Sequence, residues 1–139
     1  KNQSMFKLLN ILFVEDDAIE VMMFVRVLQK IGSNHRLIEA SNGEEALAIL
    51  KAKEIIPDII LLDLNMPKLN GIEFLKIVKS NEATRHIPVI IFTTSNNHRD
   101  IASCYKIGIS GYIIKPLKYE DYLVLVQKTL EYWSSNELL

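Results

Sequence analysis

Acidic residues stand at two places in the sequence from which they could hold a metal ion together. Glu15, Asp16 and Asp17 form one run, and Asp63 follows a later apolar stretch. Adjacent carboxylates repel one another, and a hard divalent cation between them removes that repulsion. Magnesium prefers oxygen ligands, so Asp16 and Asp63 can supply two and the backbone carbonyl of Asn65 a third. The longer Glu15 can hold a coordinated water. We therefore predict a Mg²⁺ site formed by Glu15, Asp16, Asp63 and Asn65.

A hydroxyl and an ammonium group complete this set. Thr93 ends a later apolar run, and Lys115 follows the last one. If Asp63 attacks a phosphoryl donor, negative charge spreads over the phosphoryl oxygens, and catalysis is mainly positioning and electrostatic stabilisation. Lys115 can neutralise one oxygen and Thr93 can donate to another, while the metal covers the remaining one. This chemistry makes Asp63 the candidate phosphoryl acceptor.

The elements that must position these residues alternate along the chain. Short runs rich in Ile, Val, Leu and Phe predict strands, and segments with a helical period separate them. Strands are predicted over residues 10–14, 37–40, 59–63, 89–93 and 111–114. Helices are predicted over residues 18–31, 43–53 and 118–133, with two more that open at Asn70 or Gly71 and near Asn97. This pattern predicts an α/β fold with a doubly wound five-stranded parallel sheet, which binds ligands at the carboxyl ends of its strands.

Two of these helices have an apolar face that can cover the sheet. On the first helix the face is Phe24, Val27, Leu28 and Ile31; on the last it is Tyr119, Tyr122, Leu123, Val126, Leu130 and Trp133. Further apolar residues lie off these faces. They are Val21, Met22 and Val25 on the first helix and Val124, Leu125 and Tyr132 on the last. Such surplus apolar surface predicts contact with a partner.

Length and composition exclude several classes of protein. A chain of 139 residues suits one domain. Its 16 basic and 17 acidic side chains give a formal net charge of -1, which does not favour nucleic acid as a partner. Cys104 is the single cysteine, so no intramolecular disulfide can form. No apolar run approaches the roughly 20 residues of a membrane span. We expect a cytoplasmic protein without membrane contact.

The motifs at the predicted strand ends resemble those of the response regulator receiver domain of two-component signalling. The matching segments are residues 14–17 (VEDD), 62–67 (LDLNMP), 92–95 (FTTS) and 112–116 (YIIKP). The resemblance covers nearly the whole chain. It implies a (βα)5 flavodoxin-like receiver fold, with a single receiver domain over residues 1–139, a core at about residues 8–133 and no output domain. A receiver domain is a phosphoacceptor switch, not an enzyme with turnover.

The same resemblance gives roles to the site residues. It implies that Asp63 becomes an aspartyl phosphate and that Glu15 and Asp16 are the acidic pair around Mg²⁺. Lys115 becomes the cation that contacts the phosphoryl group. The switch residues are Thr93, through its hydroxyl, and Tyr112, whose rotamer reports the state. The peptide bond between Lys115 and the following proline is expected to be cis, an isomer that proline makes accessible.

The chain is also similar to stand-alone response regulators of the phytochrome-associated type. The similarity lies in the lengthened segment 80–88 before the fourth strand, in residues 93–95 (TTS) and in residues 103–105 (SCY). A stand-alone receiver has to act through other proteins. The resemblance implies a sensor histidine kinase or a phosphotransfer protein as phosphoryl donor and an unidentified downstream protein as recipient of the signal.

The surplus apolar residues suggest where these partners bind. We predict that the kinase or phosphotransfer protein docks on the first helix through Val21 and Met22, and that the surplus on the last helix could form a homodimer. Phosphorylation would shift the population between two packings and change the surface made by the fourth helix, fifth strand and fifth helix.

Two other functions remain open at this point. A haloacid-dehalogenase-like phosphatase also uses a strand-end Asp nucleophile, but it needs a second acid where this chain has Asn65. A phosphorylation-independent adaptor with a receiver-like fold needs none of the chemistry, so chemical competence separates it from a switch. Taken singly, Asp16 could simply cap a helix and Thr93 could be an ordinary strand residue. Their joint occurrence with Asp63 and Lys115 at successive strand ends favours the phosphoryl switch.

Overall fold

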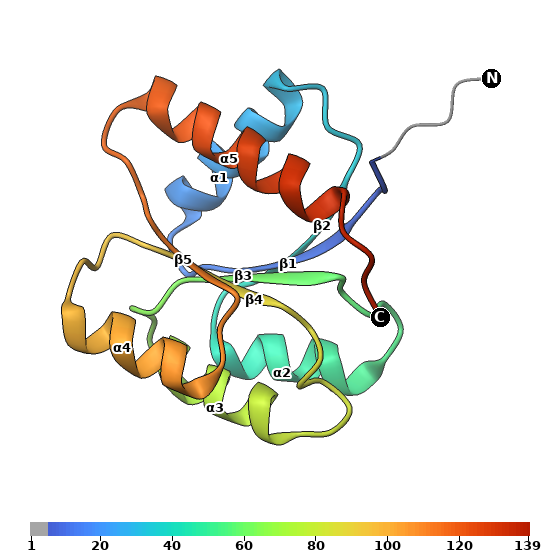
Figure 1. Ribbon diagram of the computed structural model, residues 1–139, viewed down its shortest axis with the longest axis vertical. Coiled ribbons are helices and arrows are strands. Elements are labelled where there is room, and N and C mark those ends of the chain that lie inside the picture. Colours follow the sequence, from blue (N-terminus) through green and yellow to red (C-terminus); the bar gives the residue numbers. More distant parts are fainter. Residues whose placement is uncertain (1–5) are drawn as a thin grey trace.

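The computed structural model describes residues 6–139 and contains a five-stranded parallel sheet in the order β2-β1-β3-β4-β5 (Figure 1). The strands are β1 (Asn10–Val14), β2 (Arg36–Ala40), β3 (Ile59–Leu62), β4 (Val89–Thr93) and β5 (Gly111–Ile114). The helices are α1 (Ala18–Lys30), α2 (Gly43–Ala52), α3 (Gly71–Ser80), α4 (His98–Ile107) and α5 (Tyr119–Ser134). The predicted doubly wound sheet is confirmed, and each predicted strand boundary lies within one residue of the observed one.

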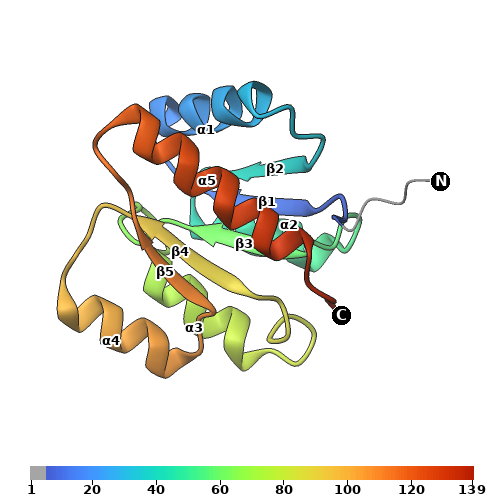
Figure 2. The same ribbon diagram turned by 45° about the horizontal axis from the view of Figure 1, so that its top comes forward.

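Helices cover both faces of the sheet. Helices α1 and α5 lie on one face, and α2, α3 and α4 lie on the other (Figures 1 and 2). Successive side chains of a strand point to opposite faces, so Ile11 and Phe13 pack with Phe24 of α1, whereas Leu12 packs with Phe74 of α3. This double coverage explains why β1, β3 and β4 are almost continuously apolar.

Side-chain caps fix the starts of four helices beside the carboxyl ends of the strands. Asp17, Asn42, Asn70 and Asn97 each accept a backbone N–H of the first turn of α1, α2, α3 and α4, respectively. Such caps satisfy amides that have no partner within the helix. Helix α5 begins after Lys118 without a side-chain cap. The caps therefore hold the loops that follow β1, β2, β3 and β4, whereas the loop after β5, which carries Lys115, has none.

The predicted core faces of α1 and α5 are mostly correct. The buried members are Phe24, Val27, Leu28, Tyr122, Val126 and Leu130. Tyr119 is wrong as a core residue, because it is the first residue of α5 and 38 % of its surface is exposed. No helix within residues 6–139 is long and apolar enough to cross a membrane.

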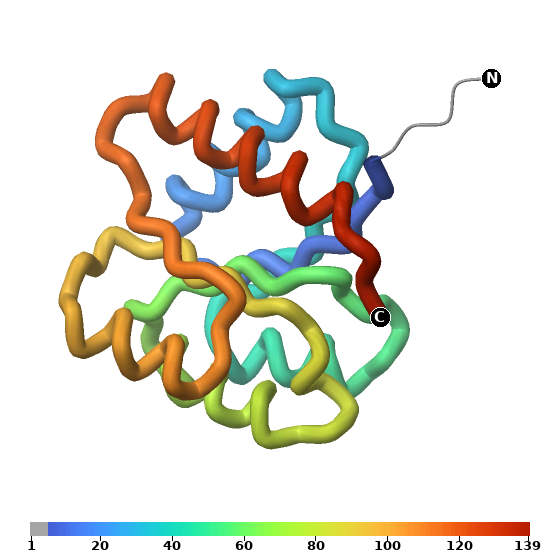
Figure 3. Tube along the Cα trace, viewed as in Figure 1, coloured from blue at the N-terminus to red at the C-terminus, as the bar shows by residue number. Residues whose placement is uncertain are grey.

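The two ends of the described chain meet at the amino ends of the strands (Figure 3). The amide of Lys7 donates to the carbonyl of Ser134 over 2.8 Å, and the Lys7 ammonium lies 3.0 Å from Glu137. Leu138 packs against the core cluster between the sheet and helices α1 and α5. The carboxyl-end rim of the sheet is left to the loops that follow each strand.

Candidate functional site

Three carboxylates converge where β1 and β3 end. Val14 and Leu62 are paired in these neighbouring strands, and the Asp63 amide donates to the Val14 carbonyl over 3.0 Å. As a result, Glu15, Asp16 and Asp63 offer oxygen atoms that lie within 4.8 Å of one another. The strand order reverses between β1 and β3, which is where doubly wound sheets bind ligands. The structure thus brings Asp63 next to Glu15 and Asp16, although Asp63 follows Glu15 by 48 positions in the sequence.

The electrostatics of these acids fit a divalent cation. Burial raises the pKa of the Asp63 carboxyl, and the charge of Asp16 adds to that effect, while Lys115, Thr93 and the amide of Asn65 oppose it. Desolvation of a carboxylate and repulsion by a second one both disfavour ionisation, and a cation reverses both. The donors are all oxygen, as Mg²⁺ and Mn²⁺ require. Asp16 is exposed, so solvent can provide further ligands.

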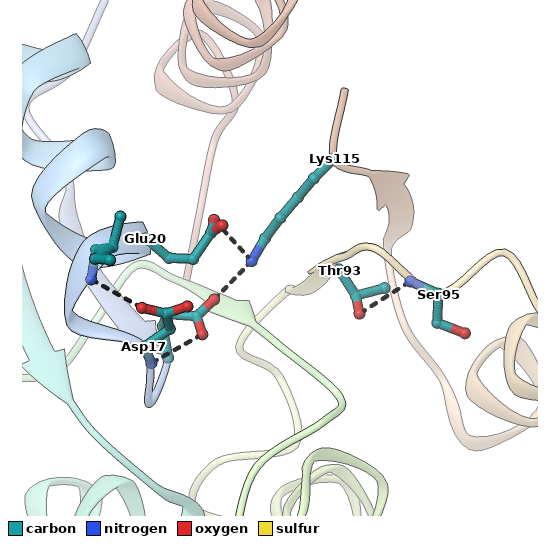
Figure 4. Close-up of polar contacts among 7 residues, drawn as sticks. Asp17, Glu20, Thr93, Ser95 and Lys115 are labelled. Atoms are coloured by element: carbon teal, nitrogen blue, oxygen red, sulfur yellow. Dashed lines mark hydrogen bonds and ion pairs between the residues drawn. The ribbon is translucent and has the colours of Figure 1, made fainter. Parts of the chain in front are cut away.

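Lys115 supplies the positive charge of the site. Its Nζ lies 2.6 Å from Glu15 Oε1 and 3.2 Å from Glu20 Oε1 (Figure 4). It also lies 5.4 Å from the centre of the Phe92 ring. Burial by itself would lower the pKa of Lys115, but the surrounding carboxylates, above all Glu15, raise it. The ammonium also lowers the pKa of Asp63. Sequence reasoning expected Lys115 beside Asp63, and the structure adds that two glutamates hold it.

Glu20 is a site residue that the sequence reasoning missed. It stands in the first turn of α1, where an acid is usually explained by the helix dipole. Its position three residues after the helix cap Asp17 places it on the turn nearest the rim. That spacing is the signal that could have identified it.

Thr93 and Tyr112 both form a hydrogen bond with the backbone of Ser95. Thr93 is fully buried, and its hydroxyl oxygen accepts the Ser95 amide at 3.4 Å (Figure 4). The Tyr112 hydroxyl donates to the Ser95 carbonyl over 2.8 Å, and the Ser95 hydroxyl donates to Asp100 over 2.9 Å. The loop after β4 is therefore held by three separate contacts. Both residues predicted to act as a switch, Thr93 at the end of β4 and Tyr112 in β5, contact this loop.

A glycine lets the start of α3 approach the acidic site closely. A Cβ atom at Gly71 would lie 2.5 Å from the carbonyl oxygen of Asp63 and 2.6 Å from the Cα atom of Leu64. The Gly71 amide also donates to the Leu64 carbonyl over 3.1 Å. Only a residue without a side chain permits this contact. Gly71 thereby fixes the backbone that carries Asp63 and Asn65.

The prediction of a cis peptide bond between Lys115 and Pro116 is wrong for this structure. No peptide bond of the described residues is cis. For a residue before proline, the trans isomer is the lower in energy, by about 0.5–1 kcal/mol, unless contacts favour cis. The Lys115 side chain reaches Glu15 with the bond trans.

Comparison with known proteins agrees with this geometry. Residues 11–127 match the model of the response regulator receiver domain. The chain belongs to this family. Two curated relatives are FilR2 of Methanothrix harundinacea, a probable methanogenesis regulatory protein, and the response regulator Rcp1 of Synechocystis. FilR2 is 36% identical over 88% of this chain and 82% of its own length, and Rcp1 is 34% identical over 88% and 87%.

Solved structures give the same result. The phosphorylated cyanobacterial phytochrome response regulator RcpA is 32% identical, with a TM-score of 0.88 over 94% of this chain and 98% of its own. The Mn²⁺-bound form of Rcp1 is also 32% identical, with a TM-score of 0.87 over 94% and 99%. The similarity to stand-alone regulators of the phytochrome type is thereby confirmed, as is the flavodoxin-like receiver fold. Receiver domains are signalling switches of two-component systems, which disfavours the phosphatase alternative.

Proposed function

We propose that Asp63 accepts a phosphoryl group from the phosphohistidine of a sensor histidine kinase or of a phosphotransfer protein, with Mg²⁺ bound beside it. One observation carries the proposal: the buried Asp63 carboxylate shares a 4.8 Å cluster with Glu15 and Asp16. The Lys115 ammonium and the Thr93 hydroxyl also act on it. Membership of the receiver family supports phosphorylation-based signalling in general, and the residues supply the detail.

The transfer needs one bond to form and one to break. An Asp63 oxygen attacks the phosphorus, and the P–N bond to the donor histidine breaks, so that its electron pair leaves with the imidazole. Mg²⁺ held by Glu15, Asp16, Asp63 and the Asn65 carbonyl would supply positive charge to one phosphoryl oxygen. Lys115 neutralises another oxygen, and Thr93 donates its hydroxyl hydrogen to a third.

The signal would leave through the surface formed by α4, β5 and α5. Exposed apolar side chains there include Tyr105 of α4 and Ile114 of β5, and Leu117 is exposed in the loop between β5 and α5. When Thr93 turns toward the phosphoryl group, its oxygen releases the Ser95 amide. The loop tied to Tyr112 then loses one of its contacts. This change would shift the population between two packings and alter the affinity of the surface for a downstream protein or for a second copy of the chain.

A groove beside the acids supports α1 as the docking element for the phosphoryl donor. Its lining includes Val21, Met22 and Val25, and the acids Glu39 and Glu45 lie on its other side. Met22 is 57 % exposed, as the surplus of apolar residues on this helix predicted. An apolar floor with an acidic rim suits a donor helix that carries apolar and basic side chains.

The decisive experiment is labelling by a small phosphodonor. The protein is incubated with acetyl phosphate or phosphoramidate, with and without Mg²⁺, and its intact mass is measured. We expect one phosphoryl adduct that requires Mg²⁺ and is absent from Asp63→Asn. A folded, Mg²⁺-loaded wild type that never forms an adduct would instead favour the phosphorylation-independent adaptor.

We further propose that residues 1–139 form a single receiver domain with its core at about residues 8–133, and that the phosphoryl transfer takes place in the cytoplasm. The single cysteine, Cys104, is buried and free, which suits a reducing compartment. No role in the transfer is assigned to it.

A further inference from the structure

Lys115 is held by two glutamates with unequal strength. Its ammonium donates a buried hydrogen bond to Glu15 Oε1 over 2.6 Å. It lies 3.2 Å from Glu20 Oε1, yet this oxygen accepts no hydrogen bond. The second attraction is therefore electrostatic without the favourable direction of a hydrogen bond. Figure 4 shows Lys115 extending from the end of β5 toward Glu20 on α1. Of the two contacts, the one to Glu20 is the easier to exchange.

Tyr122 of α5 brings an unused donor to the same region, because its ring centre lies 5.6 Å from that of Phe92, which in turn lies 5.4 Å from the Lys115 Nζ. Its side chain is 1 % exposed, and its hydroxyl has no hydrogen-bond partner among the described residues. Burial raises the pKa of this hydroxyl, and the nearby charges of Glu20 and Glu15 add to the effect. Of the buried side-chain nitrogen and oxygen atoms in residues 6–139, Glu20 Oε1 and the Tyr122 hydroxyl are the two without a hydrogen bond. One can accept and the other can donate.

A buried donor or acceptor without a hydrogen bond lowers the stability of a folded protein. A second state in which the two groups bond to each other would remove that cost. The charges explain why the pair is not joined in the resting state. The Lys115 ammonium forms an ion pair with Glu20, and its hydrogen bond to Glu15 keeps it close to Glu20. A phosphoryl group on Asp63 would add a stronger anion within reach of the ammonium. Once Lys115 turns toward it, Glu20 needs a new partner, and Tyr122 is the donor available.

We propose that Glu20 and Tyr122 form an exchange pair that controls the release of Lys115. In the resting state Glu20 attracts the ammonium away from Asp63. In the phosphorylated state Lys115 contacts the phosphoryl oxygens, and the Tyr122 hydroxyl donates to the Glu20 oxygen that Lys115 leaves. The inference rests on the proposed phosphorylation of Asp63 and adds two positioning residues to it. Glu20 opposes the transfer, and Tyr122 favours it.

The test uses fluoroberyllate, a tetrahedral mimic of a phosphoryl group, and acetyl phosphate on the Mg²⁺-loaded protein. For Glu20→Gln we expect half-saturation at a fluoroberyllate concentration roughly 1.5-fold to fivefold lower than for the wild type, and faster adduct formation. This range is that of a partly exposed ion pair. For Tyr122→Phe we expect a shift of roughly twofold to tenfold in the opposite direction, the range of a single hydrogen bond.

Glu44→Gln is the matched control. Glu44 is an exposed acid in the first turn of α2, as Glu20 is an acid in the first turn of α1, so the loss of charge near a helix start is the same. We expect Glu44→Gln to behave as the wild type. An equal effect of both substitutions would mean a general effect of net charge and would overturn the proposal.

Stability of the metal-free protein gives a readout independent of phosphorylation. Because the Tyr122 hydroxyl has no partner in the resting state, Tyr122→Phe should keep or raise the urea midpoint. A lower midpoint would reveal a resting partner and contradict the exchange.

The outcomes distinguish failure of the proposed phosphorylation from failure of the exchange pair. If the wild type binds neither reagent, the proposed function fails and the exchange pair fails with it. If the wild type reacts but Glu20→Gln is unchanged or slower, the proposed function stands and the exchange pair is overturned.

Discussion

The two ends of the sheet use polar side chains in opposite ways. At the amino ends of the strands, side chains complete the hydrogen bonding of the backbone. Asp58 accepts the Asn10 amide at 2.7 Å, and the Lys79 ammonium donates to the carbonyls of Arg85 and Ile87 over 3.0 and 2.7 Å. These contacts hold loops in place.

At the carboxyl ends, charged side chains are buried against one another instead. Glu15, Asp63 and Lys115 are each at most 8 % exposed, and Glu20 and Tyr122 contribute polar atoms without hydrogen bonds. Burying charges costs free energy unless each finds a partner. Polar side chains at the amino ends therefore stabilise the fold by bonding to the backbone. Those at the carboxyl ends are buried beside like or unpaired groups, an arrangement suited to binding a charged ligand.

The largest effect should come from removing the cation of the carboxyl-end site. Lys115→Met leaves the buried Glu15 carboxylate without its partner, and breaking a buried ion pair costs about 3–5 kcal/mol. We expect this loss in metal-free urea unfolding and a partial recovery with Mg²⁺, which supplies a replacement charge. Lys118→Met, at an exposed residue nearby, is the control. Equal losses in the two variants would contradict the assignment of Lys115.

The amino-end site should respond in stability alone. Lys79→Met removes two hydrogen bonds to backbone carbonyls and should cost about 1–3 kcal/mol in urea unfolding. Because Lys79 lies far from the acids along the strands, the rate of adduct formation with acetyl phosphate should equal that of the wild type. Lys76→Met, an exposed residue of the same helix, should change neither quantity. Slower labelling of Lys79→Met would contradict the proposal that the amino ends of the strands contribute to stability alone.

Substitutions in the groove beside α1 should separate docking from chemistry. The double variant Val21→Thr, Met22→Gln should slow phosphoryl transfer from the cognate kinase by about tenfold, the equivalent of 1.4 kcal/mol. Labelling by acetyl phosphate should be spared, since neither residue touches Asp63. Ile77→Thr, at an exposed apolar residue of α3, provides the control. Equal loss with both donors would contradict docking on α1.

The smallest effect should be a dependence of stability on pH. The pKa of Asp63 is raised by burial, so folding favours its protonated form. The resulting stabilisation is fully present below the ordinary pKa of an aspartate and is lost as the pH rises through the raised value. Without metal, Asp63→Asn should therefore gain stability relative to the wild type over that rise. Urea midpoints measured across the acidic range test this, and Mg²⁺ should abolish the difference.

Strand ends were the most predictable part of the molecule. Their apolar runs predict strands without a competing assignment. In any parallel sheet the polar residue after each run lies at the carboxyl-end edge. Glu15, Asp16, Asp63, Thr93 and Lys115 were all located in this way. The pairing of side chains was less predictable, because it depends on rotamers and on which helix lies above the rim.

Glu20 illustrates the limit. An acid in the first turn of a helix has a sufficient local explanation, so its contact with Lys115 is visible only in three dimensions. Tyr119 illustrates another limit, since the helical period does not reveal where a helix begins to extend beyond the sheet. The bond before Pro116 was expected to be cis from the family resemblance, and local sequence does not determine the isomer.

The meeting of the chain ends has a practical consequence for measurement. The hydrogen bond between Lys7 and Ser134 keeps both ends of the described chain, residues 6–139, at the amino ends of the strands and remote from Asp63. A biotin tag or a fluorescent protein attached at either end would leave the acidic rim facing away from a biosensor surface. Kinetics of kinase docking could therefore be recorded on immobilised protein with the docking groove of α1 accessible to the partner.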